Sequence, residues 1–177
     1  RCSTAERNPN VMEYGDSGSS PLGTAIQKNS LPMVRLLIER DADVNLLENR
    51  NESLLVAAIR TAEPALLRLL LESGIDASGA NAPLPRPLWH AVNSREVDLI
   101  APLLEAGADP NAPVDAEGRA ALYNAIWYGD EELVKWLLKH GTSAEAKDKE
   151  GKTPLAFAKE NEKPALVAIL KKAGAKR

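Results

Sequence analysis

The chain has 177 residues, and its 22 Lys and Arg against 25 Asp and Glu give a formal net charge of -3. This balance gives no bulk reason for a nucleic-acid or anionic-membrane partner, and no apolar run approaches the roughly 18 residues of a membrane-spanning helix. Hydrophobic residues make up 44% of the chain but aromatic residues only 4%, so Leu, Ala, Ile and Val must fill an interior of closely packed helices.

The first residues, 1–15, are polar and fit none of the patterns found further along the chain. We expect them to form an N-terminal extension or a short cap. The single cysteine, Cys2, has no partner for an internal disulfide, which favours a reducing compartment. The chain begins at Arg1 rather than Met, so the native N-terminus is not visible. We therefore expect a soluble protein, with the cytoplasm favoured and a bacterial periplasm as the alternative.

Five helix starts recur at intervals of 33 or 34 residues. The aligned triplets are Ser20-Pro21-Leu22, Ser53-Leu54-Leu55, Arg86-Pro87-Leu88, Ala120-Ala121-Leu122 and Thr153-Pro154-Leu155. A Ser or Thr hydroxyl can cap a helix N-terminus, and Pro at the first helical position gives up no needed hydrogen bond. Where Arg86 and Ala120 replace the hydroxyl, a cap worth about 1 kcal/mol is missing. Three residues past each Leu stands a small residue that permits close helix packing: Ala25, Ala58, Ala91, Ala125 and Ala158.

A second helix is predicted in each repeating unit, beginning near Leu31, Pro64, Val97, Glu131 and Pro164. Apolar pairs follow each start and are expected to face neighbouring helices: Met33-Val34, Leu66-Leu67, Leu99-Ile100, Leu133-Val134 and Leu166-Val167. Residues suited to a left-handed conformation follow these helices, namely Asp41, Gly74, Gly107, Gly141 and Gly174. A left-handed conformation is also expected in the turn between the two helices of each pair, at Asn29, Ala62, Arg95, Gly129 and Glu162.

The period of about 33 residues, the Thr-Pro-Leu start at Thr153 and the GADPN end at 107–111 resemble ankyrin repeats. The resemblance covers residues 16–177 and implies an all-α solenoid of stacked helix-turn-helix units with hairpin-like loops. The units run over about 16–48, 49–81, 82–115, 116–148 and 149–177, and the last is a C-terminal cap with a lysine-diluted outer face. Two loops should be irregular: the one with alternating prolines at 83, 85 and 87, and the one enlarged by an extra residue within 111–122.

The sequence contains few features that favour catalysis or metal binding. It has no Gly-rich phosphate loop and no paired-Cys metal spacing, and its two histidines, His90 and His140, lie in different units, whereas zinc needs three or four ligands. We expect His140 to complement a helix C-terminus and His90 to be structural. Cys2 has no nearby His and no basic cluster in the sequence that would activate it as a nucleophile. We therefore expect no enzyme activity, no metal and no cofactor.

The resemblance to ankyrin repeats implies binding through a concave face lined by the first helices and the hairpin tips. The residues predicted to contact a partner protein there are Trp127, Tyr128, Arg60, Arg119, Arg50, Asn93 and Lys152. Trp127 and Tyr128 are the main expected anchors of the interface, because aromatic residues and Arg are enriched in interface hot spots. Packing against adjacent repeats is the alternative for both. Trp89 and Tyr123 stand at the family's usual His place. Trp89 is expected to pack between repeats, Tyr123 to be structural, and Trp136 to lie in the core.

The sequence thus favours a non-enzymatic protein-protein interaction module of unidentified partner. The alternative is a stand-alone inhibitor, or a bacterial immunity-type protein, that occludes a partner enzyme. Two further classes are weaker: an enzyme with an unfamiliar site, and a scaffold or designed array. Design is disfavoured because the five units share only a few columns. We expect a monomer, since a capped solenoid gives no reason for self-association.

Overall fold

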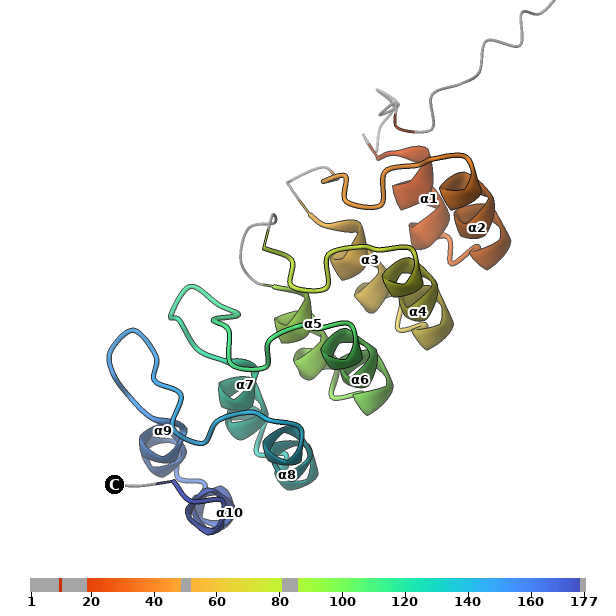
Figure 1. Ribbon diagram of the computed structural model, residues 1–177. Coiled ribbons are helices and arrows are strands. Elements are labelled where there is room, and N and C mark those ends of the chain that lie inside the picture. The colour runs from red at the N-terminus through yellow and green to blue at the C-terminus, as the bar shows by residue number, and fades with distance from the viewer. Residues whose placement is uncertain (1–9, 11–18, 49–51, 81–85, 176–177) are drawn as a thin grey trace, which may run out of the picture. The chain divides into compact units, whose positions relative to one another are not determined.

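The computed structural model describes residues 10, 19–48, 52–80 and 86–175, and this part of the chain holds ten α-helices and no strand. They are α1 (Pro21–Gln27), α2 (Leu31–Glu39), α3 (Leu54–Arg60), α4 (Pro64–Glu72), α5 (Pro87–Ser94), α6 (Val97–Glu105), α7 (Ala121–Tyr128), α8 (Glu131–Lys139), α9 (Pro154–Glu160) and α10 (Pro164–Lys172). The helices form five pairs along the chain (Figure 1). The prediction of an all-α repeat fold is therefore confirmed.

The chain divides into two compact units, Arg1–Pro83 and Leu84–Arg177. The first contains α1 to α4, with α1 packed against α2 and α3, and α3 against α4. In the second, each first helix packs on the next, α5 on α7 and α7 on α9, and each also packs on its own second helix. The second helices α8 and α10 are in contact as well. Stacking of like elements is how each pair buries its apolar face.

The helix starts follow the predicted capping chemistry. The side-chain oxygens of Ser20, Ser53 and Thr153 accept hydrogen bonds from backbone N–H groups three residues ahead, at 2.9, 3.2 and 3.2 Å. Arg86 and Ala120, both within the described residues, begin α5 and α7 without a side-chain cap. Each Leu and Ala of the two repeating columns is buried, at no more than 4% exposed. The opening motif of each repeat is therefore a helix start that carries core residues.

The second helices begin at the predicted residues, but in α2 only one member of the expected apolar pair is buried. Val34 is fully buried, whereas Met33 is 48% exposed, and Leu36 of the same helix is 42% exposed. Consecutive helical residues point about 100° apart, so only one member of a pair need face the neighbouring helices. The expectation for Met33 was wrong for this reason. Trp136, expected in the core, is half-buried, and its ring stacks on that of His140 at 3.8 Å.

Asparagines tie the hairpin segment of one repeat to the helix end of the next. Asn45 Oδ1 accepts from the backbone N–H of Asp76 at 2.9 Å, and Asn111 Oδ1 accepts from Ser143 at 2.6 Å. Asn10 makes the equivalent bond, accepting from the backbone N–H of Asp43 at 2.7 Å. The chain at Asn10 thus follows the pattern of a repeat end, which the sequence did not predict for 1–15. The expectations for Cys2 and for the rest of that segment lie outside the described residues.

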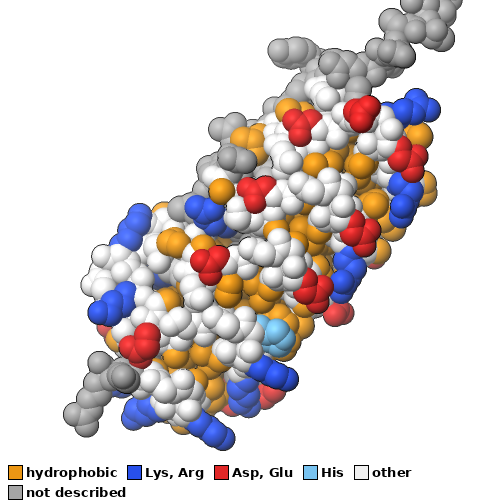
Figure 2. Space-filling view, viewed as in Figure 1, with side chains coloured by type: hydrophobic (Ala, Val, Ile, Leu, Met, Phe, Trp, Pro, Cys, Tyr) orange, Lys and Arg blue, Asp and Glu red, His pale blue; other side chains and the backbone are white. Residues whose placement is uncertain are grey.

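Acidic and basic side chains are interspersed on the face of each unit seen in Figure 2, as the near balance of charge predicts. No helix within the described part of the chain is both long and apolar enough to cross a membrane. Neither finding identifies a partner.

Candidate functional site

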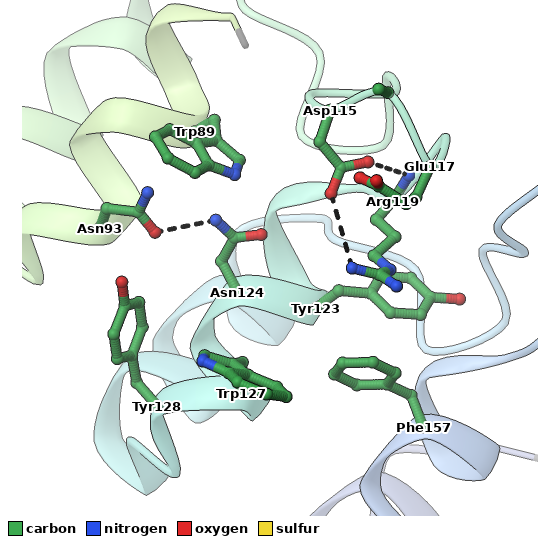
Figure 3. Close-up of a pocket in the computed structure, with 11 residues that line it drawn as sticks. Trp89, Asn93, Asp115, Glu117, Arg119, Tyr123, Asn124, Trp127, Tyr128 and Phe157 are labelled. Atoms are coloured by element: carbon green, nitrogen blue, oxygen red, sulfur yellow. Dashed lines mark hydrogen bonds and ion pairs between the residues drawn. The ribbon is translucent and has the colours of Figure 1, made fainter. Parts of the chain in front are cut away.

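A hollow of about 540 Å³ lies in the second unit, between α5, α7, the start of α9 and the loop that precedes α7 (Figure 3). We call it the aromatic hollow. Its lining residues are Trp89, Asn93, Asp115, Ala116, Glu117, Arg119, Tyr123, Asn124, Trp127, Tyr128 and Phe157. The first helices α5, α7 and α9 supply most of them.

A row of three aromatic rings leads from the core to the surface of the hollow. The ring of Phe157 lies 5.3 Å from that of Tyr123 and 6.4 Å from that of Trp127, centre to centre. Tyr123 is 1% exposed and Phe157 6%, but Trp127 is 61% exposed. The buried end of the row therefore supports an indole ring that is largely open to solvent.

Tyr123 holds the loop that precedes α9. Its hydroxyl oxygen lies 2.6 Å from the backbone carbonyl oxygens of both Ala146 and Lys152, so its single proton is shared between two acceptors. Burial raises the pKa of the Tyr123 hydroxyl, and the charge of Asp148 adds to this effect. These contacts agree with the structural role expected for Tyr123.

The enlarged loop before α7 places a carboxylate and a guanidinium at the hollow. Val114 N–H donates to the Arg119 carbonyl at 2.8 Å, and Asp115 Oδ1 accepts from the Arg119 backbone N–H at 2.9 Å. In the fifth repeat the backbone bond that corresponds to the one between Val114 and Arg119 runs from Asp148 N–H to the Lys152 carbonyl, and it spans one residue fewer. The predicted enlargement is therefore observed here, whereas the proline-rich loop at 81–85 lies outside the described residues.

The Arg119 guanidinium lies between Asp115 and Phe157 (Figure 3). Its carbon is 5.2 Å from the centre of the Phe157 ring, and Nη1 is 4.0 Å from Asp115 Oδ2. Among the described residues, Arg119 Nε has no hydrogen-bond partner. Burial raises the pKa of the Asp115 carboxyl, and the backbone hydrogen bond from Arg119 offsets part of that rise. The carboxylate is thus largely removed from water, and its counter-charge, the Arg119 guanidinium, lies at the limit of an ion pair.

Two amides meet on α5 and α7. Asn124 Nδ2 donates to Asn93 Oδ1 at 2.8 Å (Figure 3). This bond uses one group of each amide, and within the described part of the chain the structure gives no partner to Asn93 Nδ2 or Asn124 Oδ1. The pair leaves one donor and one acceptor for a ligand.

Four of the seven predicted contact residues come together in the aromatic hollow: Trp127, Tyr128, Arg119 and Asn93. Lys152 is outside the lining, and its ammonium group lies 2.7 Å from a carboxylate oxygen of Glu160, which raises the pKa of Lys152. Arg60 belongs to the first unit, where Nη1 lies 2.6 Å from Glu52 Oε1. Arg50 lies outside the described residues.

Several members of the hollow were not predicted from the sequence. Trp89 was expected to pack between repeats, and Asp115, Asn124 and Phe157 were not predicted, yet all four line the hollow. Helical spacing was the available signal. Trp89 and Asn93 are four residues apart on one helix and therefore share a face, as do Asn124 and Tyr128 on the next first helix.

The described residues contain no group of three or more His, Cys, Asp or Glu that could hold a metal ion. The ring of His90 meets that of Trp89 edge-on at 4.9 Å, and His140 caps the end of α8. The hollow itself offers aromatic, amide and charged groups suited to recognition.

A family model described as ankyrin repeats (3 copies) matches residues 4–81 and 85–176. The chain belongs to the ankyrin-repeat family. No curated protein matches it. The ten helices lie within the two matched ranges, and the first match begins upstream of Asn10, in agreement with the repeat-end bonds of that residue. Ankyrin repeats are generally protein-protein interaction modules and are typically non-enzymatic.

Proposed function

We propose that this ankyrin-repeat chain binds a partner protein through the aromatic hollow and the adjoining loop before α7. The observation that carries the proposal is the exposure of neighbouring large aromatics, Trp127 at 61% and Tyr128 at 46%, in the wall of that hollow. Trp and Tyr dominate interface energetics when a partner covers them. The functional surface of the second unit is then built on α5 and α7.

The rigidity of the surroundings supports this assignment. Trp127 is held on α7, which packs on both α5 and α9, and its ring lies 6.4 Å from the buried Phe157 ring. The loop before α7 is fixed by the bonds between Asp115, Val114 and Arg119. A surface that is ordered before binding loses less conformational entropy when a partner docks.

The remaining predicted contacts contribute less in this proposal. Arg60 and Lys152 are already paired with Glu52 and Glu160, and exposed ion pairs on a rim add little affinity. Arg50 remains a predicted contact. Occlusion of a partner enzyme is one form of such binding.

The experiment is affinity capture from a lysate of the source cells, followed by purification of the captured protein and direct titration. Intact protein is compared with a Trp127→Ala, Tyr128→Ala variant whose helicity and melting are checked first. A Met33→Ala, Leu36→Ala variant is the matched control, because it also removes two exposed apolar side chains but lies in the first unit. We expect the partner to bind the intact protein and the control and to be lost from the aromatic variant.

A partner that binds the aromatic variant as tightly as the intact protein contradicts the proposal. When the captured partner is an enzyme, its activity is titrated with the intact protein. Loss of activity at a stoichiometric ratio identifies the chain as an inhibitor.

A further inference from the structure

We propose that the aromatic hollow accepts a basic side chain, Lys or Arg, from the partner protein. The cation would lie among the rings of Trp89, Trp127 and Tyr128, with the carboxylates of Asp115 and Glu117 as its counter-charges. This inference rests on the proposed function, since it names the ligand chemistry of the same site.

The charge of the lining favours a cation. All the lining residues are described, and they include two carboxylates, from Asp115 and Glu117, against one guanidinium, from Arg119. Arg119 is held over the Phe157 ring and stands 4.0 Å from the nearer Asp115 oxygen, at the limit of an ion pair. The Asp115 side chain is only 12% exposed. A second cation in the hollow would provide the counter-charge that Arg119 supplies incompletely.

The rings favour the same ligand. Aromatic faces attract Lys and Arg side chains through the ring quadrupole, and Trp does so most strongly. The hollow already contains one such contact, since the Arg119 carbon lies 5.2 Å from the Phe157 centre. That contact occupies Phe157 and leaves Trp89, Trp127 and Tyr128 to a ligand.

The amide pair indicates that the cation belongs to a peptide rather than to a free amine. Asn93 Nδ2 and Asn124 Oδ1 supply one donor and one acceptor, which complement the C=O and N–H groups of a peptide backbone. A volume of about 540 Å³ lies within the range of ligand sites and can hold a long side chain with its flanking backbone. The hollow therefore suits one basic residue in an extended segment.

The test uses four blocked amino acids as probes: the N-acetyl methylamides of arginine, lysine, citrulline and glutamate. Citrulline has the shape of arginine without its charge. The readout is the backbone and indole N–H signals in ¹H–¹⁵N spectra of the full chain during titration. The three tryptophans give separate indole reporters, and Trp136, on the second helix α8, is the internal control.

We expect the arginine or lysine probe to shift the indole signals of Trp89 and Trp127 saturably while that of Trp136 stays in place. Binding of citrulline should be at least about fivefold weaker, because it lacks the charge. Glu117→Gln and Asp115→Asn should each weaken the basic probe, and Asn retains the oxygen that accepts from the Arg119 backbone. The control Glu132→Gln, at an exposed carboxylate on α8, should leave binding unchanged.

The inference is overturned if neither basic probe gives a saturable shift, if citrulline binds as well as arginine, or if the glutamate probe binds more tightly than both. A partner that is captured through Trp127 and Tyr128 while neither basic probe binds would refute this inference and leave the proposed function standing. Saturable binding of a basic probe alongside partner capture that ignores both aromatics would support the ligand chemistry and refute the proposed function.

Discussion

At the scale of single residues, a buried acid anchors the first repeat. Glu48 is 6% exposed, and its carboxylate accepts from the backbone N–H of Ser20 at 2.9 Å and from the Ser20 hydroxyl. Ser20 Oγ in turn accepts from Gly23 N–H, so one hydroxyl joins the carboxylate to the helix cap. A Cβ added at Gly23 would lie 2.5 Å from Glu48 Cδ. The absence of a side chain at Gly23 makes room for this network.

Gly23→Ala should therefore destabilise the protein by about 1–3 kcal/mol, because the added methyl group displaces a buried, hydrogen-bonded carboxylate. The sign is informative, since Gly→Ala within a helix ordinarily stabilises by about 0.5–1 kcal/mol. Urea unfolding followed by circular dichroism measures the difference. In a Glu48→Ala background the clash is gone, so the same substitution should be neutral or stabilising. Destabilisation of equal size in both backgrounds would count against the role given to Glu48.

Tyr123 makes a residue-scale prediction about pH. Because burial raises its pKa, the folded chain keeps the hydroxyl proton above pH 10, the ordinary tyrosine value, where the unfolded chain releases it. The contribution of Tyr123 to stability is thus complete below pH 10 and declines as the pH rises beyond it, by up to about 1.4 kcal/mol per pH unit. Tyr123→Phe should remove that decline and should cost about 1–3 kcal/mol at neutral pH, because the two backbone carbonyls lose the one donor that they share.

Unfolding free energies of the parent and Tyr123→Phe proteins between pH 8 and 11 test both effects. Tyr128→Phe is the matched control for stability at neutral pH, since it deletes a hydroxyl from an exposed ring. Identical slopes for the parent and Tyr123→Phe proteins above pH 10 would show that the Tyr123 proton is not held by the fold.

At the scale of helices, two helices that both follow a serine differ in whether that serine caps the helix N-terminus. Ser53 begins α3 and accepts from Val56 N–H, whereas Ser30 begins α2 without a side-chain cap bond to any described residue. Ser53→Ala should cost about 1 kcal/mol and Ser30→Ala less than about 0.5 kcal/mol. Thermal unfolding of the two variants, which lie in the same unit, makes the comparison. Equal losses would mean that the hydroxyl of Ser53 does not stabilise α3.

The elements were largely predictable, because their signals are local. Second helices begin at the predicted residues from Leu31 to Pro164, and residues such as Ala62 and Asp41 take positive φ where the repeat requires it. Met33 was misassigned because a pair of apolar letters does not say which member faces the neighbouring helices. Helix identity follows from periodicity along the chain, whereas burial depends on what packs against each side.

At the scale of the whole molecule, the candidate site was only partly predictable. Trp127 and Tyr128 stood out as departures from the repeating columns. The hydrogen bond from the Asn124 amide to the Asn93 amide, and the contact of Arg119 with Phe157, join residues more than thirty positions apart. Both depend on how one repeat packs against the next. Arg60 and Lys152, which stay predicted contacts, carry local ion-pair partners that the sequence did not reveal. The division into five units at the stated boundaries stays a prediction.

The central claim is that the aromatic hollow binds the partner protein, and calorimetric titration of the purified partner tests it most directly. Intact protein, the Trp127→Ala, Tyr128→Ala variant and the Met33→Ala, Leu36→Ala control are titrated in the same buffer. We predict that the aromatic variant loses at least about 30-fold in affinity, the effect of removing one hot-spot residue, and that the control changes less than about threefold. Equal affinities for the intact protein and the aromatic variant would contradict the account and place the binding surface outside the hollow.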